Sequence, residues 1–81
     1  MRLNTILPPE ATSNLSRIVL TSDSHLLIEQ HKGLFSYDEN CIRVRLADRM
    51  LFINGESLRI SEFSAQDICI QGEIRSLEFG R

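Results

Sequence analysis

The sequence predicts an all-β fold, a small antiparallel meander of seven or eight short strands that forms a sandwich or a barrel-like roll. From residue 17 onward, apolar and polar residues alternate in short bursts, which is the period of β-strands. Glycine, aspartate, asparagine, serine or glutamate separates the bursts, as is typical of turns. With 81 residues, of which 42% are hydrophobic, the chain can form one core. We therefore expect an N-terminal segment over residues 1–16 and a single β domain over residues 17–81.

Each expected element follows from a local pattern. In the N-terminal segment, Pro9 suits the first position of a helix and Glu10 suits its first turn, which predicts one short helix. The alternating bursts then predict strands at residues 17–20, 25–31, 34–37, 41–47, 50–54, 57–61, 67–71 and 73–79.

Turn signals predict how the central strands pair. The three-residue loop at 38–40 is expected to pair Ser36 with Ile42, Leu34 with Val44 and Phe35 with Arg43. A two-residue turn at Asp48 and Arg49 is expected to pair Leu46 with Leu51 and Val44 with Ile53, with Arg45 opposite Phe52. Arginine resists the positive φ that such a turn prefers.

A second turn is expected at Gly55 and Glu56, because type II′ hairpins place glycine first. It would pair Ile53 with Leu58 and Leu51 with Ile60. The stretches "LFINGESLRI" and "ICIQGEIRSLEF" resemble each other, and each contains a glycine–glutamate pair between two alternating bursts. In the second stretch the alternation slips between Ile74 and Leu77. A β-bulge or a bend near Gly72 would account for the slip.

This register separates two faces of the sheet. The core face is expected to carry Leu34, Ile42, Val44, Leu46, Leu51, Ile53, Leu58 and Ile60. The opposite face carries Leu27, Phe35, Tyr37, Met50 and Phe52, interspersed with Arg43 and Arg45. Exposed apolar patches often mark partner surfaces, so we predict an interaction face formed by Leu27, Phe35, Tyr37, Arg43, Arg45 and Phe52. Coverage by the N-terminal segment is the alternative, and sheet edges offer a second route to association, including homo-oligomers.

Glu29 and His31 raise the question of a proton-transfer or metal site. They have the same parity in the expected strand 25–31, so both would point to one face with Leu27. A metal needs about three or four convergent ligands, and the other candidates, His25, Cys41 and Cys69, are scattered over different strands. We therefore expect no metal, no cofactor and no catalytic site, and interpret His31, Gly33, Gly55 and Gly72 as structural turn residues.

Charge and composition exclude further classes. The net charge of −2 provides no general attraction for nucleic acid. Local binding of polyanions by Arg43, Arg45, Arg59 and Arg75 beside Phe35, Tyr37 and Phe52 remains the alternative function. The four glycines are isolated, so no phosphate-binding loop is predicted. No apolar run is long enough to cross a membrane. We expect a cytoplasmic chain in which Cys41 and Cys69 are free thiols.

The succession "IEQHKGLFSY", "CIRVR", "LFINGESLRI" and "ICIQGEIRSLEF" resembles the YabP/YqfC family of sporulation proteins, with the greatest similarity to its YqfC branch. The resemblance covers roughly residues 17–79. In that family a strand ends in Glu-Asn-His and a basic residue followed by glycine, and an aromatic, an Ile-Arg-Val strand and two glycine-centred hairpins come next. This chain departs at Gln30, where asparagine is usual, and at Arg49, where a turn glycine is expected.

The resemblance implies a non-enzymatic protein that acts in the mother cell of a sporulating bacterium and contributes to formation of the spore envelope. It also implies a protein partner, and a membrane-associated sporulation protein is the candidate because such a protein is the family's genomic neighbour. Together with the predicted face, this suggests an assembly or adaptor module. The family supplies no catalytic residues to transfer to this sequence.

Overall fold

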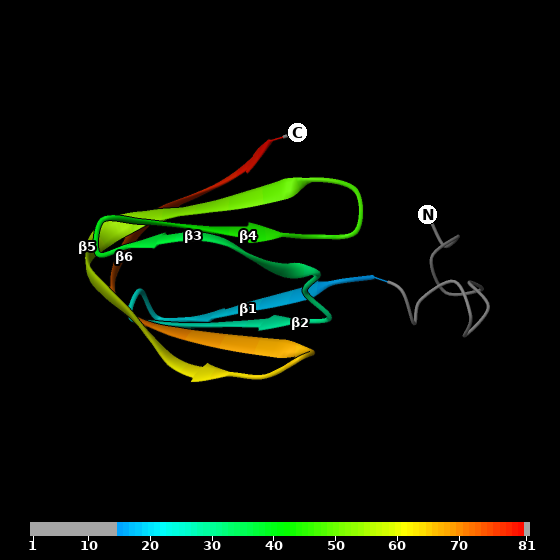
Figure 1. Cartoon of the computed structure of the whole chain (residues 1–81). Coiled ribbons are helices and arrows are strands. Elements are labelled where there is room, and N and C mark those ends of the chain that lie inside the picture. Colours follow the sequence, from blue (N-terminus) through cyan, green and yellow to red (C-terminus); the bar gives the residue numbers. More distant parts are fainter. Residues whose placement is uncertain (1–14, 81) are drawn as a thin grey trace, which may run out of the picture.

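The computed structural model describes residues 15–80 and confirms the all-β prediction, since these residues form strands, turns and loops without a helix. The strands are β1 (Arg17–Thr21), β2 (His25–Glu29), β3 (Gly33–Asp38), β4 (Cys41–Arg45), β5 (Met50–Phe63) and β6 (Asp67–Gly80). They form one antiparallel sheet in the order β1-β2-β6-β5-β4-β3 (Figure 1). The short helix predicted around Pro9 and Glu10 lies outside the described residues.

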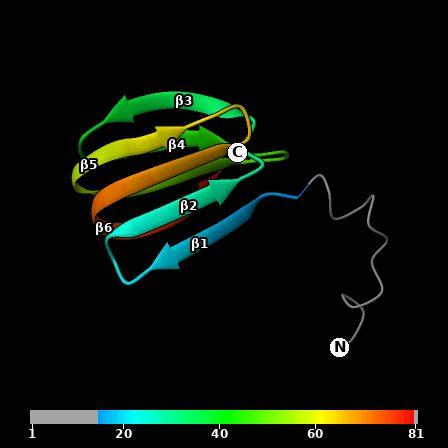
Figure 2. The same cartoon turned by 90° about the horizontal axis from the view of Figure 1, so that it is seen from below.

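Two long bent strands convert this single sheet into two layers. β5 and β6 each have 14 residues, and both bend near their middle (Figure 1). One layer, here called the β1–β2 layer, contains β1, β2, the first half of β6 and the second half of β5. The other, the β3–β4 layer, contains β3, β4, the first half of β5 and the second half of β6. Figure 2 shows β1 and β3 at opposite edges of the arrangement.

The expected seven or eight strands are therefore six, because neither Gly55 nor Gly72 ends a strand. The predicted hairpin at Gly55 and Glu56 is wrong: β5 continues through both residues, and Gly55 pairs with Ile74 on β6. A Cβ atom on Gly55 would overlap the carbonyl oxygen of Glu73, so this glycine permits close approach of two backbones. The burst at 57–61 is the second half of the same strand.

The predicted irregularity near Gly72 is confirmed. Gly72 lies inside β6 with φ of +138°, opposite two residues of β5, Ser57 and Leu58, so β5 has one extra residue at this point. A second extra residue, Arg75, separates the pairs Gly55–Ile74 and Asn54–Ser76. This bulge explains why the alternation of core residues slips between Ile74 and Leu77.

Two other loops differ from the expected register. The predicted two-residue turn at Asp48 and Arg49 is instead a four-residue connection closed by a hydrogen bond from Leu46 N to Arg49 O (2.8 Å). Val44 therefore pairs with Leu51, Ile42 with Ile53, Arg43 with Phe52 and Arg45 with Met50. The shift is two residues, so every side chain keeps its predicted face.

The loop at 38–40 is one residue shorter than expected. Asp38 pairs with Cys41 and Ser36 with Arg43, whereas the predicted pair Leu34–Val44 is confirmed. A bulge at Phe35 accommodates the one-residue difference. Its consequence is a change of face for Tyr37, which now pairs with the buried Ile42.

The core lies between the two layers. Its buried residues are Leu26, Ile28, Ile68 and Ile70 from the β1–β2 layer, Ile42, Val44, Leu46, Leu51 and Ile53 from the β3–β4 layer, and Leu58 and Ile74 near the bends. Leu34 and Ile60 pack against this cluster and are partly buried. The predicted core face is thus confirmed, because strand alternation alone determines which side chains share a face.

Hairpin turns bind the two bends in the same way. In the β1–β2 turn, Ser24 O accepts a hydrogen bond from Gly72 N (3.2 Å), and Asp23 O accepts one from Ile74 N (2.9 Å). In the β3–β4 turn, Asn40 O and Glu39 O accept hydrogen bonds from Gly55 N (3.1 Å) and Leu58 N (2.9 Å). The carbonyl groups of each hairpin turn therefore accept hydrogen bonds from backbone N–H groups at a bend, which the sheet itself leaves without partners.

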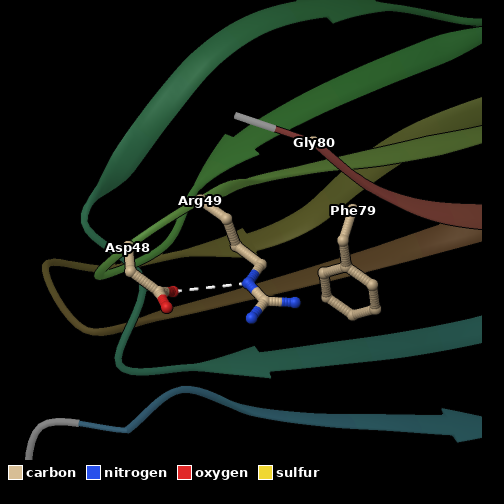
Figure 3. Close-up of a pocket in the computed structure, with 4 residues that line it drawn as sticks. All are labelled: Asp48, Arg49, Phe79 and Gly80. Atoms are coloured by element: carbon tan, nitrogen blue, oxygen red, sulfur yellow. Dashed lines mark ion pairs between the residues drawn. The ribbon is translucent and has the colours of Figure 1, made fainter.

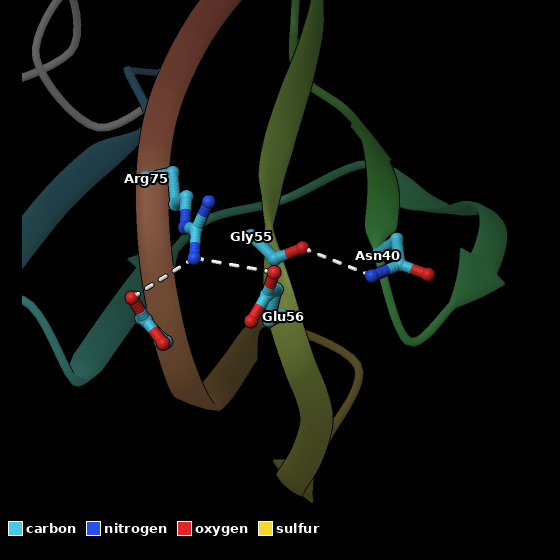
Figure 4. A network of polar contacts seen from close by, with 5 residues as sticks. Asn40, Gly55, Glu56 and Arg75 are labelled. Carbon is cyan, nitrogen blue, oxygen red and sulfur yellow. Dashed lines mark hydrogen bonds and ion pairs between the residues drawn. The ribbon is translucent and has the colours of Figure 1, made fainter.

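Charged side chains stabilise the same region. Arg75 lies 3.2 Å from Glu56 and 3.3 Å from Glu73, two carboxylates that stand on directly paired residues. The Asn40 side-chain amide also donates a hydrogen bond to Gly55 O (3.2 Å), as Figure 4 shows. Arg75, the bulge residue, thereby offsets repulsion between like charges on neighbouring strands.

Candidate interaction surface

The structure brings four of the six predicted interface residues together on the outside of the β3–β4 layer. We call these residues, Phe35, Arg43, Arg45 and Phe52, the Arg/Phe face. Arg43 and Arg45 alternate along β4 with the buried Ile42 and Val44, so strand geometry directs both arginines outward.

Each arginine of this face covers an aromatic ring on a neighbouring strand. The Arg43 guanidinium carbon lies 5.5 Å from the centre of the Phe52 ring, and that of Arg45 lies 5.7 Å from the Phe35 ring. Phe35, the extra residue of the β3 bulge, is 53% exposed. Cation–π contacts of this kind contribute about 0.5–1 kcal/mol at exposed sites. They hold the arginine heads and the rings in one surface.

Phe52 is the more buried of the two aromatics. A Cβ atom on Gly80 would lie 2.8 Å from its ring, so the ring packs closely over the glycine backbone at the end of β6. Glu78, the residue paired with Phe52 on β6, is exposed beside it. The Arg/Phe face is therefore mixed in charge.

Tyr37 and Leu27 do not belong to the Arg/Phe face. The bulge at Phe35 turns Tyr37 to the core side, where its hydroxyl donates a long hydrogen bond to Leu58 O (3.4 Å) near the bend of β5. Leu27 lies on the outside of the other layer, where it pairs with Val19 and Cys69. The sequence placed these two with the others because a bulge and a bent strand leave no mark on simple alternation.

The surroundings of Leu27 form a shallow pocket of about 240 Å³ that also involves Val19, Glu62 and Cys69. Burial raises the pKa of the Cys69 thiol, and the Glu62 carboxylate beside it, 3.8 Å from the sulfur, raises it further. The thiol therefore stays protonated and weakly nucleophilic at neutral pH. Both Cys69 and Cys41 are free, as the sequence predicts.

His31 is buried, with 7% of its surface exposed, and both of its ring nitrogens bind backbone groups. Gly33 N donates a hydrogen bond to Nδ1 (2.9 Å), so Nε2 must carry the proton that it shares with Ser64 O (2.8 Å). The His31 ring also stacks on the Phe63 ring, with 5.6 Å between the ring centres. His31 thus joins the β2–β3 connection to the β5–β6 turn, and Gly33 begins β3 beside it.

Glu29 and His31 do not converge. β2 ends at Glu29, and the positive φ of Gln30, 63°, turns the chain before His31. Glu29 instead forms an ion pair with Arg17 on β1 (3.3 Å). The expectation that both side chains share a face is therefore wrong, because it assumed a regular strand through residue 31.

One surface feature is not predicted by the sequence pattern. At the open end of the sandwich, Arg49 lies 5.3 Å from the Phe79 ring and 3.4 Å from an Asp48 carboxylate oxygen. These residues and Gly80 line a pocket of about 220 Å³ (Figure 3). The contact joins residues 30 positions apart along the chain, and no local pattern predicts it.

The part of the chain that the structure describes contains no group of three or more histidine, cysteine, aspartate or glutamate side chains placed to hold a metal. Residues 15–80 also include no helix that could cross a membrane.

The fold and this surface define a small all-β protein with two bent central strands and an exposed arginine–phenylalanine face. A model of the YabP family matches residues 12–81, and the chain belongs to that family, which is associated with sporulation. The chain is also 31% identical over 68 residues to "Uncharacterized protein YqfC" of Bacillus subtilis (strain 168), a match that covers 84% of this chain and 73% of the relative.

Proposed function

We propose that this protein is a non-enzymatic assembly or adaptor module in spore envelope morphogenesis. It acts in the cytoplasm of the mother cell and uses the Arg/Phe face to bind a membrane-associated sporulation protein. Membership in a sporulation-associated family supports the biological setting. The geometry of the Arg/Phe face supports the mode of action.

The observation that carries this proposal is the exposure of aromatic and arginine side chains in one surface. Phe35, at the bulge of β3, remains 53% exposed. Arginine and aromatic residues are enriched in the centres of protein–protein interfaces, where they supply much of the binding energy. Both rings of the Arg/Phe face already hold their arginines in place, so binding would order few side chains.

The non-enzymatic part of the proposal rests on His31 and Glu29. The imidazole that could have transferred protons is committed to two backbone hydrogen bonds, and Glu29 is paired with Arg17. Both ring nitrogens of His31 are therefore engaged, and the Glu29 carboxylate is held toward Arg17 on β1, so the two groups are not arranged as an acid–base pair.

Polyanion binding by the same face is the second candidate. Single-strand nucleic-acid binders stack bases on free aromatic rings. Here Arg43 and Arg45 occupy the rings of Phe52 and Phe35, and Glu78 adds negative charge beside them. These contacts favour a protein partner over a polyanion.

Capture of the partner from sporulating cells tests the proposal. Tagged wild-type protein, Phe35→Ala and Phe52→Ala are cross-linked in cells, and co-captured membrane proteins are quantified. Phe79→Ala is the matched control, because Phe79 is 54% exposed and lies outside the Arg/Phe face. We expect each face variant to weaken capture of the same protein by about 30-fold, the effect of losing a hot-spot residue, and the control to retain it.

Thermal unfolding of all variants is measured as a control, and each variant is expected to unfold in a cooperative transition, as a folded protein does. Capture that is equal in wild type and both face variants would refute the use of this face. Binding that instead falls steeply with salt and transfers to nucleic acid would favour the polyanion function.

A further inference from the structure

The outer edge of β1 is an unprotected sheet edge. Among residues 15–80, no strand pairs with the side of β1 that faces away from β2. β1 pairs with β2 over all five residues without a register shift. Its sequence RIVLT contains three consecutive β-branched or aliphatic residues and no proline. Regular apolar edge strands favour pairing with another strand.

The other edge of the sheet and the bends of its central strands differ in this respect. β3, at the opposite edge, is interrupted by the bulge at Phe35, and bulges disfavour edge-to-edge pairing. The bends of β5 and β6 are covered by hairpin turns through hydrogen bonds to Leu58 N and Ile74 N. β1 is therefore the edge strand of the described sheet that has regular pairing along its whole length.

The core side of β1 is incompletely covered. Leu20 pairs with the buried Leu26 and shares its face, yet it is 44% exposed. Ile18, on the same face, is partly buried against the core. The β3–β4 layer thus does not extend under the end of β1, which leaves both an apolar surface to cover and room for a neighbouring molecule.

We propose that β1 pairs antiparallel with β1 of a second copy of this chain, around a twofold axis at Val19. In this register Val19 faces Val19 of the second copy, Ile18 faces Leu20, and Arg17 faces Thr21. Residues that face each other share a side of the sheet, so Ile18 and Leu20 of both copies form one apolar cluster on the core side.

The charge pattern favours this self-pairing. Arg17, the charged residue of β1, faces a neutral threonine, so no like charges meet across the twofold axis. The interface repeats itself in both copies, as closed dimers require. It joins the two β1–β2 layers into one continuous sheet and leaves both Arg/Phe faces free for partners.

Opposite charges at position 21 test the register. Thr21 is exposed, so both substitutions are compatible with the fold. Thr21→Arg places an arginine opposite Arg17 at two symmetric sites, and we expect the dissociation constant of the dimer to rise about 2- to 30-fold. Thr21→Glu creates two ion pairs and is expected to lower it. Molecular mass is measured by light scattering after size exclusion over a concentration series, at low and at high salt.

The matched controls are Ser36→Arg and Ser36→Glu on β3, at the opposite edge of the sheet, which should leave the mass unchanged. A dimer that responds in opposite directions to the two charges at position 21, with both responses reduced by salt, supports the proposal. A monomer at all concentrations, a dimer indifferent to position 21, or a dimer sensitive to position 36 would overturn it. Phe35→Ala should not change the dimer, so failure of this proposal is distinguishable from failure of the proposed function.

Discussion

The β1–β2 layer and the β3–β4 layer are built from equivalent parts but differ at their exits and edges. In each, a hairpin pairs with the first half of a long strand. Leu26 and Ile28 pair with Ile70 and Ile68 in one layer, and Ile42 and Val44 pair with Ile53 and Leu51 in the other. Each long strand then reaches a glycine whose backbone N–H binds the turn of its hairpin. The two layers thus share the same arrangement of core residues and the same hydrogen bonding at the bend.

The differences begin where each hairpin ends. β2 leaves its layer through Gln30 and the buried His31, whereas β4 continues through the four-residue loop Leu46–Arg49 into β5. The edge strand β1 is regular, and the edge strand β3 is bulged and carries Phe35. The shared parts hold the fold together, and the parts that differ supply the surfaces on which both proposals rest.

The strongest test of the equivalence lies at the two bends. We expect Gly72→Ala and Gly55→Ala each to reduce the free energy of unfolding by about 3 kcal/mol or more, because a Cβ atom at either site meets backbone that cannot move. At Gly72 the Cβ would lie 2.6 Å from Ser57 O, and the φ of +138° adds strain. Urea unfolding measures the free energy of unfolding of both variants.

Gly33→Ala is the control for strain without overlap, since Gly33 has the same φ and no atom within 4 Å of a Cβ. Its expected cost is about 1 kcal/mol. A loss at Gly55 as small as that at Gly33 would show that the two bends are not equivalent.

The second prediction concerns the exit of the β1–β2 layer. His31→Ala should reduce the free energy of unfolding by about 2–3 kcal/mol, because Ser64 O and Gly33 N lose their partners in a partly buried site. His31→Asn should cost about half as much, since asparagine can still accept a hydrogen bond from an N–H two residues on. Thermal and urea unfolding provide the measurement.

Ala47 is the matched control, because it follows Val44 by three residues as His31 follows Ile28. It is exposed, and Ala47→Ser should change stability by less than about 0.5 kcal/mol. Equal losses of stability at positions 31 and 47 would contradict the view that the hydrogen bonds of His31 stabilise the connection after β2.

The sequence predicted the core better than the connections, and the reason is physical. Strand alternation determines the face of a residue whatever its partner, so Ile42, Val44, Leu51 and Ile53 were placed on the core face even though their pairing register was wrong by two residues. Glycine is ambiguous by contrast. Gly55 precedes glutamate as a hairpin glycine would, but it serves the close approach of β6.

The candidate surface was predicted in part for the same reason. Arg43, Arg45 and Phe52 lie where alternation places them, whereas Tyr37 follows a bulge and changes face. Alternation gives Leu27 the same outward direction, but the bends of β5 and β6 place it on the other layer. Bulges and bends depend on contacts between distant residues, such as Glu73 with Gly55 and Ser57 with Gly72. The local sequence pattern does not predict such contacts.

The smallest predicted effect concerns Gln30, at the exit that distinguishes the β1–β2 layer. Its φ of 63° lies in the left-handed region, which asparagine tolerates better than glutamine. The structure uses the Gln30 backbone oxygen, which accepts a hydrogen bond from the Ser16 hydroxyl (2.9 Å). We therefore expect Gln30→Asn to raise the free energy of unfolding by about 0.5 kcal/mol, as measured by urea unfolding.

Gln66→Asn is the matched control for this substitution. Gln66 also belongs to the closure around His31, because its backbone oxygen accepts a hydrogen bond from His31 N (3.1 Å), but its φ is not positive. Without a left-handed backbone to favour asparagine, this variant should gain no stability. An equal gain at both positions would indicate a general effect of the shorter side chain, whereas a gain confined to position 30 would show that backbone conformation at this exit limits the stability of the β1–β2 layer.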